Sequence, residues 1–344
     1  MLDVVIVGCG PRGLAVALEC TKRGLNYKVF DSYPLKTWKN LSWYEFQMRS
    51  PIEFDLVNGN KNDKYSLHNF LKEIKEEPAE FITRQLFTKY LSWVYEVISA
   101  NVIKNKIKKI YKDRVIDETN TEYKAYKIVL ANGSRPKKPR YAIDKVISPE
   151  LLYAKSSLNL VIFGSGQAAA EFAAFFARRN QVTWVVNQKP RVYQYPIPDY
   201  LCWGYKSAFG DYFKKLSYLD KLKYLKSVKE WQPSITPGVK KLIDENSANI
   251  KIIEQPSLNA INQIVNYNDY CLLAIGSEYK LSNYSYLPKL NTHTSNFLSV
   301  TTGFKTSIPS IRITGLGAVF YDGLRQGSIS SAYNTAKEIL DVDN

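Results

Sequence analysis

The sequence predicts an α/β fold in which one parallel-sheet domain is inserted into another, and three observations lead to this prediction. An apolar run at 4–7 leads directly into the segment 8–13, which has the spacing G-x-G-x-x-G. A second apolar run, at 160–163, leads into a similar segment at 164–169. Each segment is followed by helical spacing and then a short apolar strand, which completes a βαβ unit. We therefore predict two nested Rossmann-like dinucleotide-binding domains with three-layer ββα/βαβ architecture and a small helical, aromatic insertion.

The first unit has the residue pattern expected of a βαβ repeat. Residues 3–7 are expected to form a strand, and 4–7 are a continuous apolar run, typical of a buried parallel strand. Helical spacing over 14–23 ends before Gly24, a residue suited to the end of a helix, and residues 27–31 indicate a second strand that ends in an acid. The elements expected next are a long aromatic-rich loop region crossing a binding site at 34–62, helices at 67–76 and 84–100, antiparallel strands between 102 and 130, and a basic linker at 135–140.

The second unit covers 159–186, with an Ala- and Phe-rich helix at 167–179. Residues 190–245 then break the α/β rhythm and are rich in Tyr, Trp and Phe, which indicates an insertion of loops and helices that caps a site. The elements expected after it are strands at 250–254, 260–265, 270–275 and 310–314, and a final helix from near 325 to 341. These patterns predict a first domain of residues 1–140 and 280–344, and a second of residues 141–279 with the insertion at about 190–245.

Composition favours a cytoplasmic enzyme. The chain has 344 residues, 45% of them hydrophobic, and contains no apolar run of the ~20 residues that a membrane span needs. Its four cysteines form no C-x-x-C, so we expect neither a disulfide scaffold nor a metal site. The net charge of +15 comes from lysines spread at amphipathic spacing, which favours solvated faces and an anionic cofactor or substrate over nucleic acid. The sequence leaves a homo-oligomer open.

The first glycine-rich loop has the residues needed to hold a dinucleotide. Gly8 permits the tight turn, Gly10 leaves room for a pyrophosphate, and Gly13 allows close packing of helix and strand. The helix that follows presents N–H groups and a positive dipole end to the phosphates. Asp31, 18 residues after Gly13, is placed to accept hydrogen bonds from an adenosine ribose. Further candidate contacts near this site are Pro11, Arg12 and Trp38.

The second loop differs from the first in two respects. Ala169 replaces the third glycine, which slightly wider packing tolerates. The second strand of this unit ends without an acid and is followed by Lys189 and Arg191, cations placed where a 2′-phosphate would lie. This favours NADPH over NADH, the alternative being that both cations are solvated loop residues. The other candidate contacts are Gly164, Ser165, Gly166, Gln167 and Asn187.

Taken together, the two loops resemble those of the two-dinucleotide-binding flavoproteins, in which the first domain holds FAD and the second NAD(P)H. Residues 130–134 are similar to the strand-end A-T-G segment of that family, and 273–277 are similar to a second copy. Ile313–Gly315 and the segment 325–332 resemble its last flavin-binding segment. The acid that usually follows the strand-end glycine is absent, so backbone or Asp322 would replace it. The resemblance implies cofactor contacts from Ala131, Asn132, Gly133, Gly315, Leu316, Arg325 and Gln326.

Three branches of this family compete. The thioredoxin-reductase-like branch needs a second sulfur near the first, and the C-x-x-C is missing. A reductase without its own dithiol stays open. Residues 48–57 resemble the flavin-proximal segment of the lysine and ornithine N-hydroxylating monooxygenases, 65–72 and 81–94 resemble the helices that follow it, and 164–171, G-S-G-Q-A-A-A-E, are close to that group's second loop. Two departures are Arg49 in place of the usual Gln and the missing His of the monooxygenase fingerprint.

The closest resemblance therefore implies an FAD-dependent, NADPH-consuming oxidoreductase, a monooxygenase that hydroxylates a small molecule through a C4a-hydroperoxyflavin formed with O2. The cofactors carry this chemistry, and the protein orients them and excludes water. Arg49 is the candidate catalytic residue, because a cation there could stabilise the peroxide anion; a salt bridge to Glu53 or Asp55 is the alternative. Two other functions stay open: an NADPH-dependent flavin reductase of a disulfide or other small acceptor, and a non-catalytic dinucleotide-binding regulatory protein.

Overall fold

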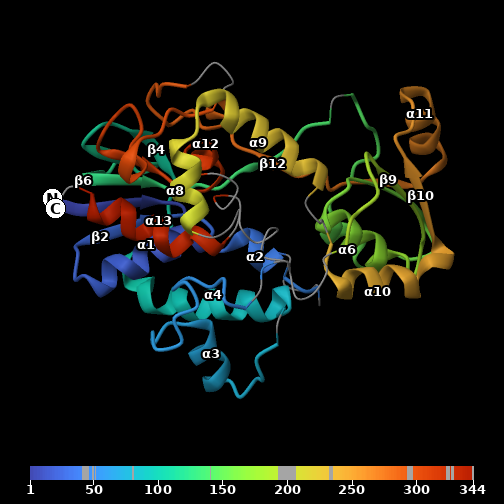
Figure 1. Ribbon diagram of the computed structural model, residues 1–344, viewed down its shortest axis with the longest axis horizontal. Helices are drawn as coiled ribbons and strands as arrows, with labels where there is room; N and C mark the ends of the chain where they lie inside the picture. Colours follow the sequence, from blue (N-terminus) through green and yellow to red (C-terminus); the bar gives the residue numbers. More distant parts are fainter. Residues whose placement is uncertain are drawn as a thin grey trace. The chain divides into compact units, whose positions relative to one another are not determined.

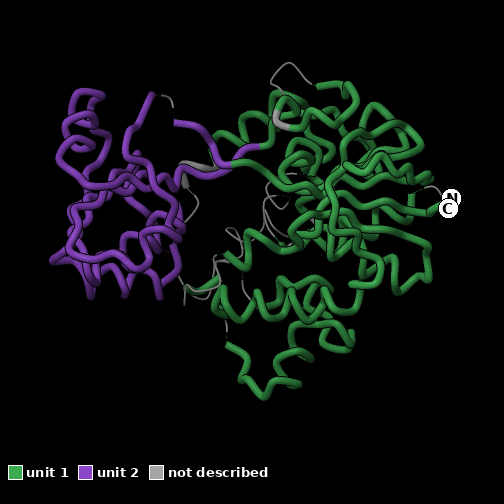
Figure 2. Tube along the Cα trace, turned by 180° about the vertical axis from the view of Figure 1, so that it is seen from behind, with its two compact units in different colours: residues 1–135, 199–229, 279–344 green, residues 136–198, 230–278 purple. Residues whose placement is uncertain are grey.

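The computed structural model of the chain divides it into two compact units (Figure 2). It describes residues 1–40, 46–48, 50, 52–79, 81–139, 141–192, 207–231, 235–292, 297–322, 326 and 329–342. The first unit consists of Met1–Arg135, Asp199–Lys229 and Tyr279–Asn344, and the second of Pro136–Pro198 and Glu230–Glu278. The short strands β7 (Arg135–Pro136) and β12 (Ser277–Glu278) pair with each other where the chain passes from one unit to the other.

A seven-stranded sheet forms the centre of the first unit, in the order β3-β2-β1-β6-β5-β4, with β13 paired to β6. Strand β1 runs parallel to β2 and β6, and β13 runs parallel to β6. Strands β4, β5 and β6 pair antiparallel, which confirms the antiparallel segment expected before residue 130. The strands are β1 (Leu2–Val7), β2 (Tyr27–Phe30), β3 (Val102–Ile103), β4 (Ile107–Ile110), β5 (Arg114–Asp117), β6 (Glu122–Leu130) and β13 (Ile311–Ile313).

Helices α1 and α13 lie side by side in Figure 1, and α1 also contacts α4. Their inward side chains, such as Leu14, Leu91 and Ile339, are fully buried in one core with the sheet. The final helix begins at Ala332, later than the sequence indicated, directly after a 3-10 turn at 329–331. The helices of this unit, apart from the insertion, are α1 (Pro11–Lys22), α2 (Lys36–Asn40), α3 (Leu67–Glu73), α4 (Arg84–Ile98), α12 (Val319–Asp322) and α13 (Ala332–Asp341), with 3-10 turns at 99–101, 281–283, 302–304, 315–318 and 329–331.

Two buried aspartates fix loops of the first unit. The Asp55 carboxylate accepts hydrogen bonds from the backbone N–H groups of Val57, Gly59 and Leu67, which ties its loop to the start of α3. Burial raises the pKa of Asp55, and the three N–H donors oppose that rise. Asp117 ends β5. Burial opposes ionisation of its carboxylate as well, but hydrogen bonds from side chains and backbone of the adjoining turns outweigh burial and lower the pKa of Asp117.

The second unit has a four-stranded parallel sheet in the order β10-β9-β8-β11. Residues 260–265, expected as a strand, lie instead in helix α11. The expectation was wrong because the apolar residues that face the core there, Ile261 and Val265, are four apart, and Ser257 caps the helix start. The elements of this unit are β8 (Asn159–Phe163), β9 (Gln181–Val186), β10 (Ile250–Glu254), β11 (Tyr270–Leu273), α5 (Pro149–Leu152), α6 (Gln167–Phe176), α10 (Pro237–Glu245), α11 (Leu258–Tyr267) and a 3-10 turn at 247–249.

Val192 and Ile235, which flank the insertion (residues 193–234), form a parallel bridge, so the two ends of the insertion are joined to adjacent points of the second unit. Its described part contains helices α8 (Ser207–Lys215) and α9 (Tyr218–Trp231). The sequence interpretation placed about 190–245 in the second domain, whereas Asp199–Lys229 belong to the first unit. The reason is packing: α8 contacts α12, and the ring of Tyr218 lies 5.1 Å from that of Phe320.

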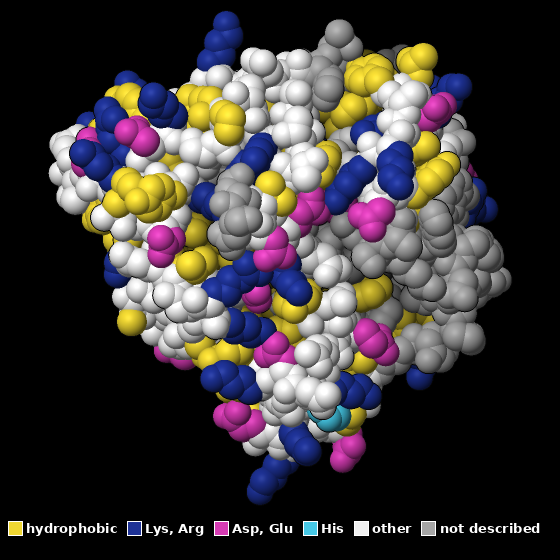
Figure 3. Space-filling view, turned by 60° about the vertical axis from the view of Figure 1, so that its left-hand side comes forward, with side chains coloured by type: hydrophobic (Ala, Val, Ile, Leu, Met, Phe, Trp, Pro, Cys, Tyr) yellow, Lys and Arg dark blue, Asp and Glu magenta, His cyan; other side chains and the backbone are white. Residues whose placement is uncertain are grey.

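Charged side chains are mixed on the surface. In Figure 3, lysines and arginines stand among acidic and apolar side chains over the face that is shown. This arrangement fits the solvated faces expected for the lysine-rich segments. None of the helices in the described part of the chain is long and apolar enough to cross a membrane.

Candidate functional site

Three parallel strands of the first unit end at the same level, and the first glycine-rich loop starts there. The strand register pairs Val7 with Leu130 and Leu130 with Ile313. The residues that follow these strand ends are Gly8, Ala131 and Thr314. Because ligands of α/β sheets bind outside the carboxyl ends of the strands, this edge is the candidate site.

The glycines of the first loop serve two different needs. A Cβ on Gly8, whose φ is +107°, would lie 2.3 Å from the carbonyl oxygen of Ala131. A Cβ on Gly13 would lie 2.0 Å from the carbonyl oxygen of Gly8. At Gly10, by contrast, a Cβ would meet no other heavy atom within 4 Å. Packing therefore requires Gly8 and Gly13, while Gly10 borders open space of the kind that a closely approaching ligand needs.

The first turn of α1 is left without a side-chain cap. Gly10 is its N-cap and Pro11 follows at the first helical position. Helices α3 and α4 of the same unit begin differently, because the hydroxyls of Ser66 and Thr83 accept hydrogen bonds from their first turns. The start of α1 thus presents backbone N–H groups and a positive dipole end, as a phosphate site requires.

Asp31, just after the end of β2, supports this loop and keeps acceptor capacity. One carboxylate oxygen accepts a hydrogen bond of 2.8 Å from the N–H of Cys9, and the other accepts one of 2.9 Å from the N–H of Tyr33. A carboxylate has about four acceptor positions, so hydroxyls of a ribose can still be accommodated. The ribose contact expected of Asp31 stays a prediction.

Arg12 and Gln326, both expected to contact the cofactor, hydrogen-bond to other parts of the protein. The Arg12 guanidinium donates to the side-chain oxygens of Thr314, Gln326 and Ser331. The buried Gln326 amide also binds Asp322, so the carboxylate considered as a substitute for the missing acid is occupied within the fold. These contacts tie the C-terminal segment to the first glycine loop.

The other predicted contacts of the first site lie around it. Asn132 donates from Nδ2 to the Tyr286 hydroxyl at 2.8 Å, and the Gly133 carbonyl accepts from the Tyr284 hydroxyl at 2.9 Å. Leu316 is half-buried in the turn after Gly315. Trp38 lies on α2 with its ring 5.3 Å from that of Phe87, at the edge of the core. Arg49 and Arg325 are outside the described residues.

The second unit repeats this construction. A Cβ on Gly164, whose φ is +138°, would lie 2.3 Å from the carbonyl oxygen of Ala274, the counterpart of Ala131. A Cβ on Gly166 would meet nothing within 4 Å, as at Gly10. Gly166 is the N-cap of α6 and gives it no side-chain cap. The indole N–H of Trp184 donates to the Gly164 carbonyl at 2.8 Å, which fixes the loop on β9.

Some of the predicted contacts of the second site hydrogen-bond within the protein, and others are exposed to solvent. The Ser165 hydroxyl accepts from the N–H of Asn187 at 2.9 Å and so joins the loop to the end of β9. The Gln167 amide is buried, donating to Glu171 and accepting from the N–H of Thr236, so it supports the start of α10. The exposed side chains of Lys189 and Arg191 follow the strand, as a site for a 2′-phosphate requires.

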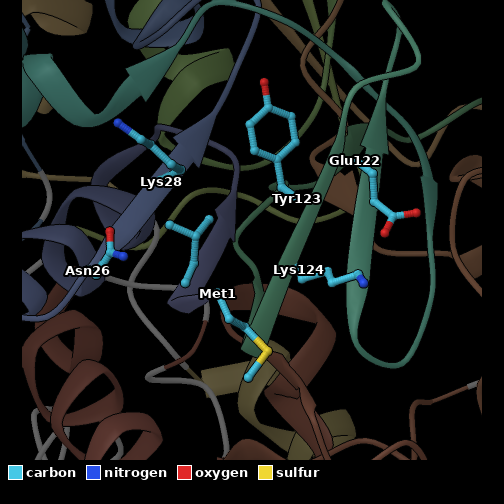
Figure 4. Close-up of a pocket in the computed structure, with 7 residues that line it drawn as sticks. Met1, Asn26, Lys28, Glu122, Tyr123 and Lys124 are labelled. Atoms are coloured by element: carbon cyan, nitrogen blue, oxygen red, sulfur yellow. The ribbon is translucent and has the colours of Figure 1, made fainter.

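A hollow at the opposite edge of the first sheet is not part of these sites. It has a volume of about 350 Å³ and is lined by Met1, Leu2, Asn26, Lys28, Glu122, Tyr123 and Lys124 (Figure 4). These residues are at the amino ends of β1, β2 and β6, away from the glycine loop. In the described part of the chain, no three His, Cys, Asp or Glu side chains are grouped so that they could hold a metal ion.

Sequence reasoning missed the contacts that join segments distant in the chain. Tyr284 and Tyr286 hold the segment that contains Asn132 and Gly133, and Lys214 on α8 is close to the carboxylates of Asp322 and Glu338. No local pattern marks these residues, because their partners lie more than a hundred positions away.

Known proteins resemble this chain in sequence family and in fold. The family model for L-lysine 6-monooxygenase/L-ornithine 5-monooxygenase matches residues 1–245. A solved structure of the ornithine N-hydroxylase KtzI from Kutzneria sp. 744, with reduced FAD, NADP+ and L-ornithine, is similar at a TM-score of 0.81 and 16% identity, over 99% of this chain and 98% of that one. The FAD-bound cadaverine monooxygenase DfoA from Erwinia amylovora gives a TM-score of 0.76 and 17% identity, over 99% and 94%.

Curated relatives match this chain over only part of their own length. The soluble pyridine nucleotide transhydrogenase of Aliivibrio fischeri is 23% identical over 211 residues, which are 55% of this chain and 43% of the relative. This chain therefore matches less than half of the length of that relative. The solved structures confirm the predicted fold class. The family model covers well over half of the chain and confirms the resemblance seen in its motifs: the chain belongs to the L-lysine 6-monooxygenase/L-ornithine 5-monooxygenase family.

Proposed function

We propose that this protein is an FAD-dependent, NADPH-consuming monooxygenase that hydroxylates the side-chain nitrogen of a small amine. The observation that carries the proposal is the pair of glycine loops, alike in backbone construction but followed by different charges. Asp31 accompanies the loop at Gly8, whereas Lys189 and Arg191 accompany the loop at Gly164. An acid suits the ribose hydroxyls of an adenosine, and cations suit a 2′-phosphate.

FAD fits the first loop. The backbone at Gly10 borders open space, the first turn of α1 offers uncapped N–H groups, and Asp31 keeps acceptor positions for the ribose. When bound, FAD supplies the oxygen-activating chemistry of such enzymes. What the chain contributes is the cradle: it neutralises phosphate charge with the helix dipole and orients the adenosine through Asp31.

NADPH fits the second loop, where Gly166 and the start of α6 repeat the same cradle. Lys189 and Arg191 would hold the additional phosphate that distinguishes this dinucleotide from NADH. Arg49 stays the candidate for electrostatic stabilisation of developing negative charge at the reacting centre.

The substrate class follows from the family and from the solved relatives, one crystallised with L-ornithine and one described as a cadaverine monooxygenase. Ornithine, lysine and cadaverine share a primary amine at the end of a short aliphatic chain. We infer that a small amine of this kind is the substrate. The alternative, an NADPH-dependent flavin reductase, draws on the partial match to transhydrogenases.

One experiment separates these functions. The purified protein is loaded with FAD, reduced anaerobically with NADPH or NADH, and mixed with O2 while the flavin spectrum is followed. A monooxygenase shows a transient species between reduced and oxidised flavin, prefers NADPH, and forms a hydroxylamine from ornithine, lysine or cadaverine. Direct reoxidation without a transient, with turnover only on a disulfide or artificial acceptor, would establish the reductase. A protein that takes up no FAD would refute both.

A further inference from the structure

The side-chain amide of Gln326 is buried and uses all of its hydrogen-bonding positions within the protein. The residue is 1% exposed. Its oxygen accepts from the guanidinium of Arg12 at 2.9 Å and from the backbone N–H of Gly315 at 3.1 Å. Its nitrogen donates to the Asp322 carboxylate at 2.6 Å and to the Thr335 hydroxyl at 2.8 Å. An amide has two acceptor and two donor positions, so all four are filled.

A glutamine side chain matches the hydrogen-bonding groups that surround it. Two donors face its oxygen and two acceptors face its nitrogen, which fixes the orientation of the amide. Glutamate would keep the contacts to Arg12 and Gly315 but would set a second carboxylate against Asp322. An aliphatic residue would remove one acceptor from the half-buried Arg12 guanidinium and one donor from the buried Asp322 carboxylate. Both N–H groups of this amide are thus engaged within the protein, and the cofactor contact implied for Gln326 by the resemblance stays a prediction.

The Gln326 amide oxygen is hydrogen-bonded to the backbone of Gly315. Gly315 follows β13 at the level where β1 and β6 also end, beside the first glycine loop. A Cβ on Gly315 would lie 3.3 Å from Cδ of Arg12, which belongs to the first turn of α1. The Gly315 N–H and the Arg12 guanidinium both donate to the amide oxygen of Gln326. This oxygen therefore links the turn at 315–318 to the first glycine loop.

Lys214, on helix α8 of the insertion, lies near the Asp322 carboxylate that binds Gln326. Asp322 is fully buried, and its second carboxylate oxygen lies 3.7 Å from Nζ of Lys214 on α8. The same ammonium lies 2.6 Å from a carboxylate oxygen of Glu338. Asp322 is fully buried and Glu338 is half-buried, and a buried carboxylate needs a cation or hydrogen-bond donors to offset its desolvation. Lys214 supplies the cation, and α8 is therefore held to the same group of residues that holds Gly315.

We propose that Gln326 is a positioning residue of the first dinucleotide site and that Lys214 supports it through Asp322. The relay Lys214–Asp322–Gln326–Arg12 holds the turn at 315–318 at the distance from the first glycine loop that the dinucleotide requires. The consequence for the cofactor rests on the proposed binding of FAD, whereas the relay itself does not.

The test uses full-length protein and compares Lys214→Met and Gln326→Leu with wild type. Lys215→Met is the matched control, since Lys215 is the next residue on α8 and is exposed. Lys214→Arg retains the positive charge and should keep amide exchange and FAD binding at their wild-type values. The first measurement is amide hydrogen exchange of residues 314–318 without added cofactor, and the second is the dissociation constant of FAD from the change in flavin fluorescence on titration.

We expect faster exchange at 314–318 and FAD binding weakened by about tenfold or more in Lys214→Met and Gln326→Leu, with wild-type values in Lys215→Met and Lys214→Arg. Unchanged exchange in Lys214→Met would overturn the relay. Faster exchange with an unchanged FAD dissociation constant would overturn the positioning role. If the wild type binds no FAD, the proposed function fails and the exchange comparison still decides the relay. Gln326→Leu is interpreted only when its circular dichroism spectrum matches wild type, and Lys214→Met carries the test otherwise.

Discussion

Replacing Gly10 with alanine should affect the stability of the cofactor-free protein and the binding of the dinucleotide in opposite directions. The N-cap φ of −88° is accessible to alanine, and the added Cβ would meet no other heavy atom of the protein within 4 Å. Such a Gly→Ala change stabilises a protein by about 0.4–1 kcal/mol, because the unfolded chain loses freedom. The cofactor-free variant should therefore unfold at or slightly above the midpoint of wild type.

With the dinucleotide bound, the result reverses. The methyl group would occupy space that the pyrophosphate needs, and overpacking of this kind costs about 1–3 kcal/mol. That cost corresponds to a dissociation constant for FAD about 5- to 150-fold larger. Gly166→Ala should act in the same way on NADPH and leave FAD binding at the wild-type value, because the two loops are built alike.

The assay is urea unfolding without cofactor, followed by titration of FAD and of NADPH. Gly13→Ala is the control for steric damage, since its Cβ would lie 2.0 Å from the Gly8 carbonyl oxygen and should destabilise the fold itself. Wild-type affinity for FAD in Gly10→Ala would refute the assignment of the space beside Gly10 to the pyrophosphate. A loss of cofactor-free stability in Gly10→Ala would show that this space is not open.

Three further predictions follow from charge and burial. Asp117→Asn should destabilise the protein by about 1–3 kcal/mol at pH 7; because the folded pKa of Asp117 is lowered, this difference should shrink as pH falls below about 4, measured by urea unfolding across pH. Burial raises the pKa values of the Cys9 and Cys20 thiols to about 12, so mass spectrometry after alkylation at pH 8 should find both unmodified until the protein unfolds. Lys189→Ala should raise KM for NADPH about two- to fivefold and leave KM for NADH unchanged, whereas Lys251→Ala, an exposed control on β10, should change neither.

The features that could be predicted from sequence are those whose physical cause is local. The turn at Gly8 and the acid at the end of β2 lie within one βαβ unit, and their spacing carries the chemistry. Residues 260–265 show the limit, because a six-residue segment with four apolar side chains fits a strand and a helix alike. The four-residue spacing of Ile261 and Val265 indicates a helix only when the neighbouring turns are also considered.

The role of Gln326 could not be predicted, because it depends on distant partners. Its four contacts come from α1, the end of β13, α12 and α13, and Arg12 precedes it by 314 positions. The motif predicted a cofactor contact for Gln326, but it gave no sign of these four hydrogen bonds within the protein. The same holds for Lys214, whose pairing with Asp322 depends on how the insertion packs.

The bridge between Val192 and Ile235 has a consequence for how this chain can change in length. Since the two ends of the insertion already meet, a short turn could join them without redirecting the strands of the second sheet. The entropy of closing a loop rises only slowly with its length, so segments of very different size can be exchanged at this point for a small change in folding free energy. We therefore expect the second unit to tolerate a segment of different length at this point, whereas the contacts of α8 with α12 and α13 depend on the sequence of the segment.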